Sequence, residues 1–338
     1  MKIKNPFPKI TKRAKSYLGR RPHRTFRMTR RRDYVRSLEL PGYFAFSRYV
    51  TKTIWPHRKT FGLLALIYAV MTALMVGIAS QDAYSTLRDT LNATSGNLFA
   101  GGLGEIGKAS LLFASAATGG ISQSLTEVQQ VYGGLIILLT WLTSIWLLRN
   151  ILAGHKVKVR DGIYSAGSPI VSTFIVALVV TVQLLPFALS LIGYAAASAS
   201  GLLDGGVEAM LFWIAAGLLT MLSLYWLTST FFALIIVTLP GMYPFKAIKT
   251  SGDLVIGRRL RILLRLVWMM LSTVIIWAAI MIPIILIDKW IKGLWSAVEW
   301  VPIVPVILLT LTSLTIIWVS SYIYLLYRKV VADDAKPA

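Results

Sequence analysis

The sequence predicts an all-α polytopic membrane protein with six transmembrane helices, and three observations support this fold class. First, 56% of the residues are hydrophobic and only 14% are charged, which departs from the usage of soluble domains. Second, the apolar residues form six runs that approach or exceed about 20 residues, the length that a helix needs to cross a bilayer. Third, 31 of the 35 Lys and Arg residues lie on one side of these runs.

Each of the six runs is expected to be a helix, because lipid offers no hydrogen-bond partners to an unpaired backbone. None of them contains an ionisable residue other than tyrosine, so we expect a buried interior without acids or bases. Pro283 is expected to break the fifth helix near its outer end. The runs are Phe61–Ser80, Val131–Leu148, Pro169–Ala197, Met210–Leu239, Leu266–Ile287 and Val301–Tyr327.

The distribution of cations predicts the orientation of the helices. The N-terminal tail, the second and fourth connections and the C-terminal tail hold 31 Lys and Arg residues, whereas the first, third and fifth connections hold four. Because cationic loops stay on the cytoplasmic side, both termini are expected in the cytoplasm. The fifth connection, Asp288–Trp300, is then outside. The sequence therefore predicts a multi-pass protein of a bacterial cytoplasmic (inner) membrane.

The chain is predicted to have three parts. Residues 1–40 form a basic tail that is too polar to bury a core and is expected to be largely disordered. Residues 41–330 form the six-helix domain, and residues 331–338 form a short cytoplasmic tail. Within the domain, the outer connection 81–130 is rich in Gly, Ala and Ser, and it is re-entrant, helical on the outer surface or disordered.

One unit recurs three times in the six-helix domain: a short basic amphipathic segment followed by two transmembrane helices that form a hairpin. The segments are Pro41–Lys59, Asn150–Ser168 and Pro240–Arg265. The first and third begin alike, since Leu40-Pro41-Gly42 with Phe46 matches Leu239-Pro240-Gly241 with Phe245 at a distance of 199 residues. Segments of this kind lie in the headgroup plane and extend their cations towards anionic lipid.

The basic surface predicts binding to anionic headgroups, because each Lys or Arg near an anionic leaflet contributes about 1 kcal/mol. An acidic protein or RNA is the alternative partner for the Arg-rich tail. The oligomeric state is left open. The expected contacts are Arg20, Arg21, Arg30, Arg31, Arg32, Arg48, Lys52, Arg58, Lys59, Lys156, Lys158, Arg160, Lys246, Lys249, Arg258, Arg259 and Arg261.

The sequence contains few groups that could carry out catalysis. Cysteine is absent, which excludes thiolate nucleophiles and thiolate metal sites. The three histidines, His23, His57 and His155, all lie on the expected cytoplasmic side. No zinc-protease, nucleophile-elbow or phosphate-loop motif is present. We therefore predict no catalytic, cofactor-binding or metal-binding residue, and a protein that is not an enzyme.

Polar side chains within the runs allow two interpretations. Gln183, Thr220, Ser223 and Ser313 could line a path for a lipid or a small solute. Alternatively, and more commonly, such groups form hydrogen bonds between closely packed helices. The absence of charged residues in the runs argues against coupling to protons through carboxylates.

One segment resembles a known family. Lys246-Ala247-Ile248, Ser251, Leu254, Val255 and Gly257-Arg258-Arg259 resemble the membrane domain attached to some bacterial glycerophosphodiester phosphodiesterases, and the related six-helix YciC-like proteins. The resemblance implies an interfacial Ser-x-x-Leu-x-x-Gly segment before a transmembrane helix and a link to the lipid envelope. It transfers no catalytic residue, because catalysis in those phosphodiesterases belongs to a soluble barrel domain.

Together these features predict a non-enzymatic integral inner-membrane protein that binds anionic lipid and serves as a scaffold or accessory factor in envelope homeostasis. The alternative is a transporter of a lipid or small solute through a path between the hairpins. A polar cavity reaching the middle of the membrane would favour the transporter, and a tightly packed bundle would favour the scaffold.

The predicted orientation can be tested by labelling single cysteines, since the chain has none of its own. Ser85→Cys is expected to react with a membrane-impermeant maleimide added outside the cell. Ser165→Cys is expected to react only when the cytoplasmic face is exposed. The reverse labelling pattern would overturn the topology.

Overall fold

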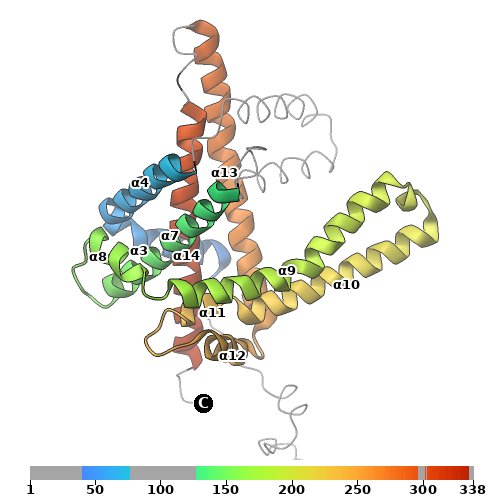
Figure 1. The fold of residues 1–338 in the computed structure, drawn as a ribbon, viewed down its shortest axis with the longest axis horizontal. Coiled ribbons are helices and arrows are strands. Elements are labelled where there is room, and N and C mark those ends of the chain that lie inside the picture. The colour runs from blue at the N-terminus through green and yellow to red at the C-terminus, as the bar shows by residue number, and fades with distance from the viewer. Residues whose placement is uncertain (1–39, 77–126, 296–300, 302, 335–338) are drawn as a thin grey trace, which may run out of the picture.

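The computed structural model describes residues 40–76, 127–295, 301 and 303–334, and every regular element in this part of the chain is a helix (Figure 1). Six helices of the described part are long and apolar enough to cross a membrane, the first together with the short helix before it. They are α4 (Arg58–Met75), α7 (Glu127–Leu152), α9 (Ile170–Ala199), α10 (Gly206–Thr230), α13 (Arg259–Leu294) and α14 (Ile303–Asp334).

A short helix precedes α4, α9 and α13. These helices are α3 (Tyr43–Ile54), α8 (Val159–Ala166) and α12 (Pro244–Val255). They pack against α14, α7 and α10, respectively. Each one buries its fourth and eighth residues, which lie about one helical turn apart and therefore on one face. The buried pairs are Phe46 and Val50, Gly162 and Ala166, and Ala247 and Ser251.

The sequence match between the first and third segments does not pair equivalent positions. The helices begin at Tyr43 and Pro244, 201 residues apart, whereas the matching letters are 199 residues apart. Phe46 is accordingly fully buried, but Phe245 is 81% exposed. The first Leu-Pro-Gly sequence, which ends at Gly42, is followed directly by α3. The second ends at Gly241, and two further residues separate it from α12, so the backbone enters the two helices differently.

The largest cluster of buried apolar side chains lies where α4, α7 and α14 contact one another. Leu64 and Tyr68 of α4, Leu148 of α7 and Leu326 of α14 belong to it. The Tyr68 hydroxyl shares a 2.7 Å hydrogen bond with the Thr143 hydroxyl of α7, so the one polar group of this tyrosine is satisfied within the cluster. Helix α13 packs on α14 through a second, smaller cluster that includes Trp277 of α13 and Leu311 of α14.

A buried arginine attaches α3 to the long helices. Arg265 of α13 is 7% exposed, its guanidinium donates to the carbonyl of Pro41, and it lies 4.3 Å from the centre of the Tyr43 ring. The attraction between a cation and an aromatic face is strengthened when both are removed from water. Phe46 meets the edge of Tyr322 of α14 at 4.8 Å. The start of α3 is therefore held by α13 and α14 together.

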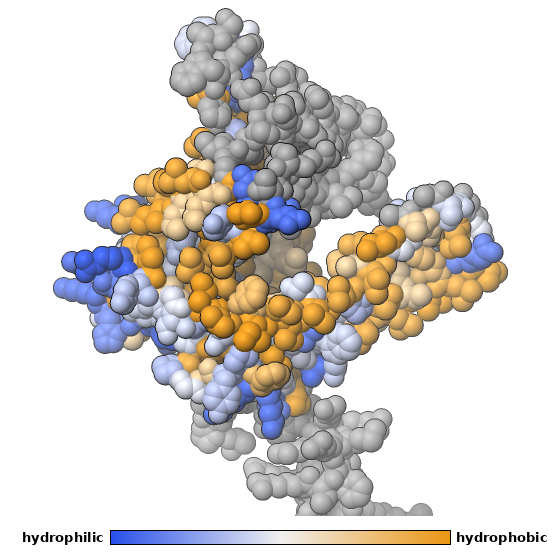
Figure 2. Space-filling model, viewed as in Figure 1, coloured by the Kyte–Doolittle hydropathy of each residue, from blue (hydrophilic) through white to orange (hydrophobic). Residues whose placement is uncertain are grey.

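Helices α9 and α10 lie side by side and extend away from the cluster of α4, α7 and α14 (Figure 1). Only 11% of the most apolar stretch of each helix is buried within the protein, and apolar residues cover this pair in the space-filling view, whereas hydrophilic residues gather around α8 (Figure 2). Apolar surface of this extent needs a non-aqueous surrounding or a partner.

Helix α9 continues through Pro186 because a serine of α10 completes its hydrogen bonding. A proline within a helix disturbs the turn before it. Here Ser223 bridges the disturbed turn: the backbone N–H of Phe187 donates to the Ser223 hydroxyl at 3.0 Å, and this hydroxyl donates to the carbonyl of Gln183 at 2.8 Å. Ser223 therefore joins the two helices and satisfies two backbone groups that would pair directly in a regular helix.

Helix α13 continues through Pro283 and runs on to Leu294, beyond the expected end of the fifth run at Ile287. Asp288, expected in the outer connection, is 1% exposed and forms an ion pair at 3.0 Å with Lys292, one turn further along the same helix. This spacing brings the two side chains together and stabilises the additional turns. The expectation of an interior without acids or bases therefore fails at this end of α13.

The fourth helix is shorter than its apolar run. Helix α10 ends at Thr230, and a short helix, α11 (Ala233–Ile236), follows after a turn. The Ser251 hydroxyl of α12 donates to the carbonyl of Ser229 at 2.6 Å. This bond satisfies one of the carbonyls left open at the end of a helix and places α12 against α10.

Replacing Phe46 by alanine tests the attachment of α3. Phe46→Ala is expected to lower the free energy of unfolding by about 3–5 kcal/mol, the usual cost of emptying a buried phenylalanine site. Phe245→Ala is the matched control, because Phe245 is exposed, and we expect it to change the melting temperature little. Tryptophan fluorescence of the detergent-purified protein during heating measures both. Equal melting temperatures for the two variants would contradict the role of Phe46.

The bridge at Pro186 predicts a stability difference between two hydroxyl deletions. Ser223→Ala leaves two backbone groups without their partner and is expected to cost about 1–3 kcal/mol. Thr181→Ala is the control, since the exposed Thr181 hydroxyl bonds only within its own helix. Thermal unfolding of both variants measures the difference. A Ser223→Ala protein as stable as the control would show that the hydroxyl does not support α9.

Candidate functional site

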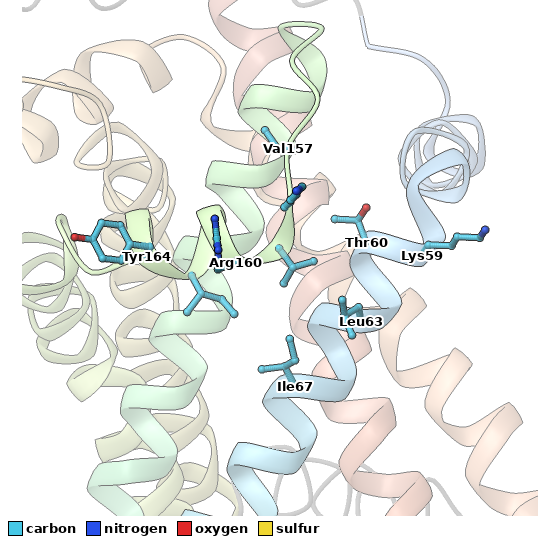
Figure 3. A pocket seen from close by; sticks show the side chains of 10 residues that line it. Lys59, Thr60, Leu63, Ile67, Val157, Arg160 and Tyr164 are labelled. Carbon is cyan, nitrogen blue, oxygen red and sulfur yellow. The ribbon is translucent and has the colours of Figure 1, made fainter.

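A groove of about 740 Å³ lies between the beginning of α4 and α8. Helix α4 contributes residues on one face, and the chain entering α8 together with α8 itself contributes the opposite wall (Figure 3). The lining residues are Lys59, Thr60, Leu63, Ile67, Val157, Lys158, Val159, Arg160, Ile163 and Tyr164.

The groove changes from charged to apolar along its length. On α4 the lining residues follow one another as Lys59, Thr60, Leu63 and Ile67, a distance of about 12 Å at the helical rise per residue (Figure 3). Across the groove, α8 adds Arg160 beside the apolar Ile163. A molecule with an anionic head and an apolar body matches this order of side chains.

Close packing of α8 against α7 forms the wall of the groove. A Cβ atom added to Gly162 would lie 3.0 Å from the Cγ atom of Leu147 and 3.1 Å from the Cγ2 atom of Thr143. Glycine therefore allows this approach without displacing the two neighbouring side chains. The turn before α8 includes Gly154 with a φ of 83°, a conformation that glycine adopts without strain.

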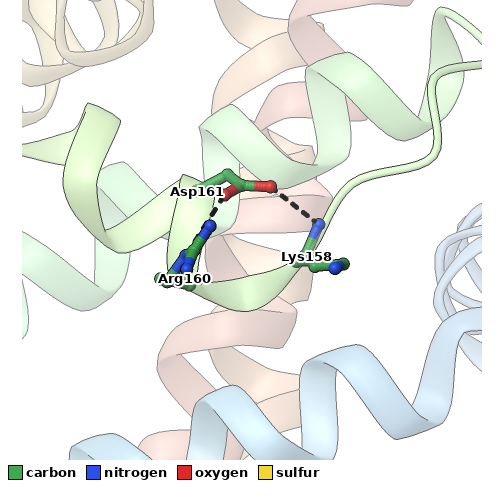
Figure 4. A network of polar contacts seen from close by, with 3 residues as sticks. All are labelled: Lys158, Arg160 and Asp161. Carbon is green, nitrogen blue, oxygen red and sulfur yellow. Dashed lines mark hydrogen bonds and ion pairs between the residues drawn. The ribbon is translucent and has the colours of Figure 1, made fainter.

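Asp161 stabilises the first turn of α8 and leaves the cations available. Its carboxylate accepts the backbone N–H of Lys158 at 3.4 Å, which places a negative charge at the start of the helix (Figure 4). It also lies 3.7 Å from Nε of Arg160, whose side chain is 88% exposed. An exposed pair of this kind is worth little, so Arg160 can exchange Asp161 for another anion.

The structure brings three of the predicted lipid contacts together, Lys59, Lys158 and Arg160, and separates the others. Arg259 lies 4.0 Å from the centre of the Tyr225 ring, and Arg58 lies 5.5 Å from that of Trp55. The predicted contacts of the tail, Arg20, Arg21, Arg30, Arg31 and Arg32, lie outside the described residues. The exposed cations on other surfaces are Arg48, Lys52, Lys156, Lys246, Lys249 and Arg261.

Arg258 does not fit the expected role. It is 3% exposed, and its guanidinium donates to the carbonyl of Val330 at 3.2 Å. The side chain therefore turns into the protein, where it joins the start of α13 to the end of α14, and it is not presented to a headgroup. The adjacent Gly257, in the turn between α12 and α13, has a φ of 79°, a conformation that glycine adopts without strain.

The four residues of the predicted polar path lie on two parts of the structure. Gln183, Thr220 and Ser223 belong to the α9–α10 pair, whereas Ser313 lies on α14, from which that pair extends away (Figure 1). Thr220 and Ser313 donate to carbonyls of their own helices at 2.8 and 3.2 Å. The side-chain oxygen of Gln183 has no hydrogen-bond partner among the described residues.

The sequence analysis did not identify Arg149 and Arg265 as residues that join distant segments. Each lies directly beside an apolar run, Arg149 after the second and Arg265 before the fifth. This position next to a membrane helix was the signal in the sequence that could have identified them. Leu63, Ile67 and Tyr164 were also missed as groove residues, because membership of the groove depends on which helix faces them. Among the described residues, no group of three or more His, Asp or Glu side chains could hold a metal ion.

No protein-family model, curated protein or solved structure matches this chain. The resemblance of residues 240–262 to the membrane domain of the phosphodiesterases therefore rests on those residues and on the predicted topology.

Proposed function

We propose that the chain is a non-enzymatic integral protein of a bacterial cytoplasmic membrane that binds an anionic phospholipid in the groove between α4 and α8. The headgroup lies against Lys59, Lys158 and Arg160, and an acyl chain follows Leu63 and Ile67. One observation carries the proposal: three cations from two segments distant in the sequence line a single groove whose other residues are mostly apolar. The positive-inside rule supports placing these cations at the cytoplasmic headgroups.

The headgroup decides the affinity in this proposal. Bilayer tails are as apolar as the side chains of the groove, so moving an acyl chain from lipid to the groove gains little. Each cation near an anionic leaflet contributes about 1 kcal/mol, and about 1.4 kcal/mol corresponds to a factor of ten in affinity. Three cations therefore support a preference of roughly a hundredfold for an anionic over a zwitterionic lipid.

The repeated architecture supports a scaffold. Each short helix packs on a different long helix, α3 on α14, α8 on α7 and α12 on α10. We propose that they are three interfacial amphipathic helices, each followed by a transmembrane hairpin, with both chain termini in the cytoplasm. The exposed cations of α3 and α12 then face the same leaflet as the groove. Such a protein would adhere to lipid over three sites and act as an accessory factor in the envelope.

The transporter alternative has less support. Thr220 and Ser223 bond to backbone groups of the α9–α10 pair, and Ser313 bonds within α14. These hydroxyls are used in the contacts that hold the helices together, and they are not collected around one path. The proposed partners of the tail, an acidic protein or RNA, stay predictions, because residues 1–39 lie outside the described part.

The groove is tested by removing its charges. The combined Lys59→Gln, Lys158→Gln and Arg160→Gln variant is expected to bind phosphatidylglycerol roughly a hundredfold more weakly than the unchanged protein. Native mass spectrometry of the detergent-purified full chain, titrated with phosphatidylglycerol or phosphatidylethanolamine, measures the binding.

The matched control changes the net charge equally on another surface: Lys246→Gln, Lys249→Gln and Arg261→Gln. We expect this variant to keep the strongest phosphatidylglycerol site. Equal weakening in both triple variants would show that binding follows net charge and not the groove.

A further inference from the structure

A second cavity, of about 600 Å³, lies beyond Tyr164, the residue that lines both it and the groove. Its walls come from α7, from the connection between α8 and α9, and from the segment that follows α11. No carboxylate lines it. Its polar side chains are a partly buried arginine and several hydroxyls, so the cavity is suited to an anion and unsuited to a cation.

Arg149 supplies the positive charge. Its guanidinium donates to the carbonyl of Thr238 at 3.1 Å and to the Thr238 hydroxyl at 2.5 Å. These two bonds position the side chain but do not neutralise it, and within the described part of the chain Arg149 forms no ion pair. A guanidinium has five N–H donors, so donors remain for an anionic ligand.

Three serines in the same cavity have unused hydroxyls. Ser165, Ser168 and Ser172 line it, and none of these hydroxyls has a hydrogen-bond partner among the described residues. The neighbouring Thr173 behaves differently and donates to the carbonyl of Pro169 at 2.8 Å. Ser168 lies in the exposed turn before α9, and Ser165 and Ser172 are partly exposed, so these hydroxyls are open to the cavity and available to a ligand there.

We propose that this cavity binds a phosphate group, either of a soluble phosphate ester or of a lipid with a terminal phosphate. Arg149 provides the charge, and Ser165, Ser168 and Ser172 provide hydroxyl donors. A phosphate has enough acceptor oxygens for all of these groups, whereas a carboxylate offers two. This site is separate from the groove and does not depend on it.

The experiment uses the full chain in detergent and two probes. Isothermal titration with inorganic phosphate measures binding of the soluble group, and native mass spectrometry with phosphatidic acid measures binding of the lipid. The Ser168→Ala and Ser172→Ala double variant leaves the bonds of Arg149 to Thr238 intact, and we expect it to weaken binding roughly a hundredfold or more, through loss of two hydrogen bonds to a charged group. Arg149→Gln is expected to weaken binding further.

The matched control is Thr173→Ala, since the Thr173 hydroxyl bonds within its own helix, and we expect binding to be unchanged. Serine-dependent binding of inorganic phosphate assigns the site to a soluble ligand, and serine-dependent binding of phosphatidic acid alone assigns it to a lipid. Absence of binding with both probes, or binding unaffected by the double serine variant, would overturn the proposal.

The groove variant separates this result from the proposed function. The combined Lys59→Gln, Lys158→Gln and Arg160→Gln protein is expected to keep its affinity for inorganic phosphate, and the double serine variant is expected to keep its affinity for phosphatidylglycerol. A loss of both affinities in either variant contradicts the existence of two sites.

Discussion

The packing of α8 on α7 is the contact on which both candidate sites depend. Gly162 permits it, because a Cβ atom there would lie only 3.0 Å from Leu147, and the neighbouring side chains would have to shift. With α8 at this distance, its residues form one wall of the groove, and Tyr164 lines both the groove and the second cavity. A glycine within an eight-residue helix costs stability, and the close approach explains why it is present.

Two kinds of cation occur in this protein, and their hydrogen-bond partners distinguish them. Arg149 and Arg265 donate to backbone carbonyls of segments distant in the sequence, so they hold elements together. Lys59 and Arg160 extend from exposed positions at the groove, where the nearest carboxylate partner of Arg160 is loosely held. The Lys and Arg residues therefore include groups that hold the fold together as well as exposed groups, for which we propose contact with anionic headgroups.

The serine hydroxyls also fall into two groups, those that bond to the backbone of another helix and those without a partner in the described structure. Ser223 gives its hydroxyl to the backbone around Pro186, and Ser251 gives its hydroxyl to the end of α10. These groups stabilise helices where the regular backbone pairing is interrupted. Ser168 and Ser172 have no such task in the described structure, and they lie beside Arg149. Their hydroxyls are at least partly exposed, so they are open to a ligand in the cavity.

The sequence by itself determined the number and approximate location of the six long helices, since length and polarity of a run are properties of neighbouring residues. It also located the three basic segments that contain α3, α8 and α12. It located the end of α13 too early, since the helix runs on to Leu294 with Asp288 and Lys292 paired one turn apart, and it did not show that the equivalent positions of α3 and α12 are 201 residues apart. Only the tertiary structure brought Lys59 and Arg160 to one groove, paired Ser223 with α9 and placed the serines in one cavity with Arg149. These contacts depend on which helices pack against each other. The pattern of apolar residues along one helix does not show which other helix will pack on it.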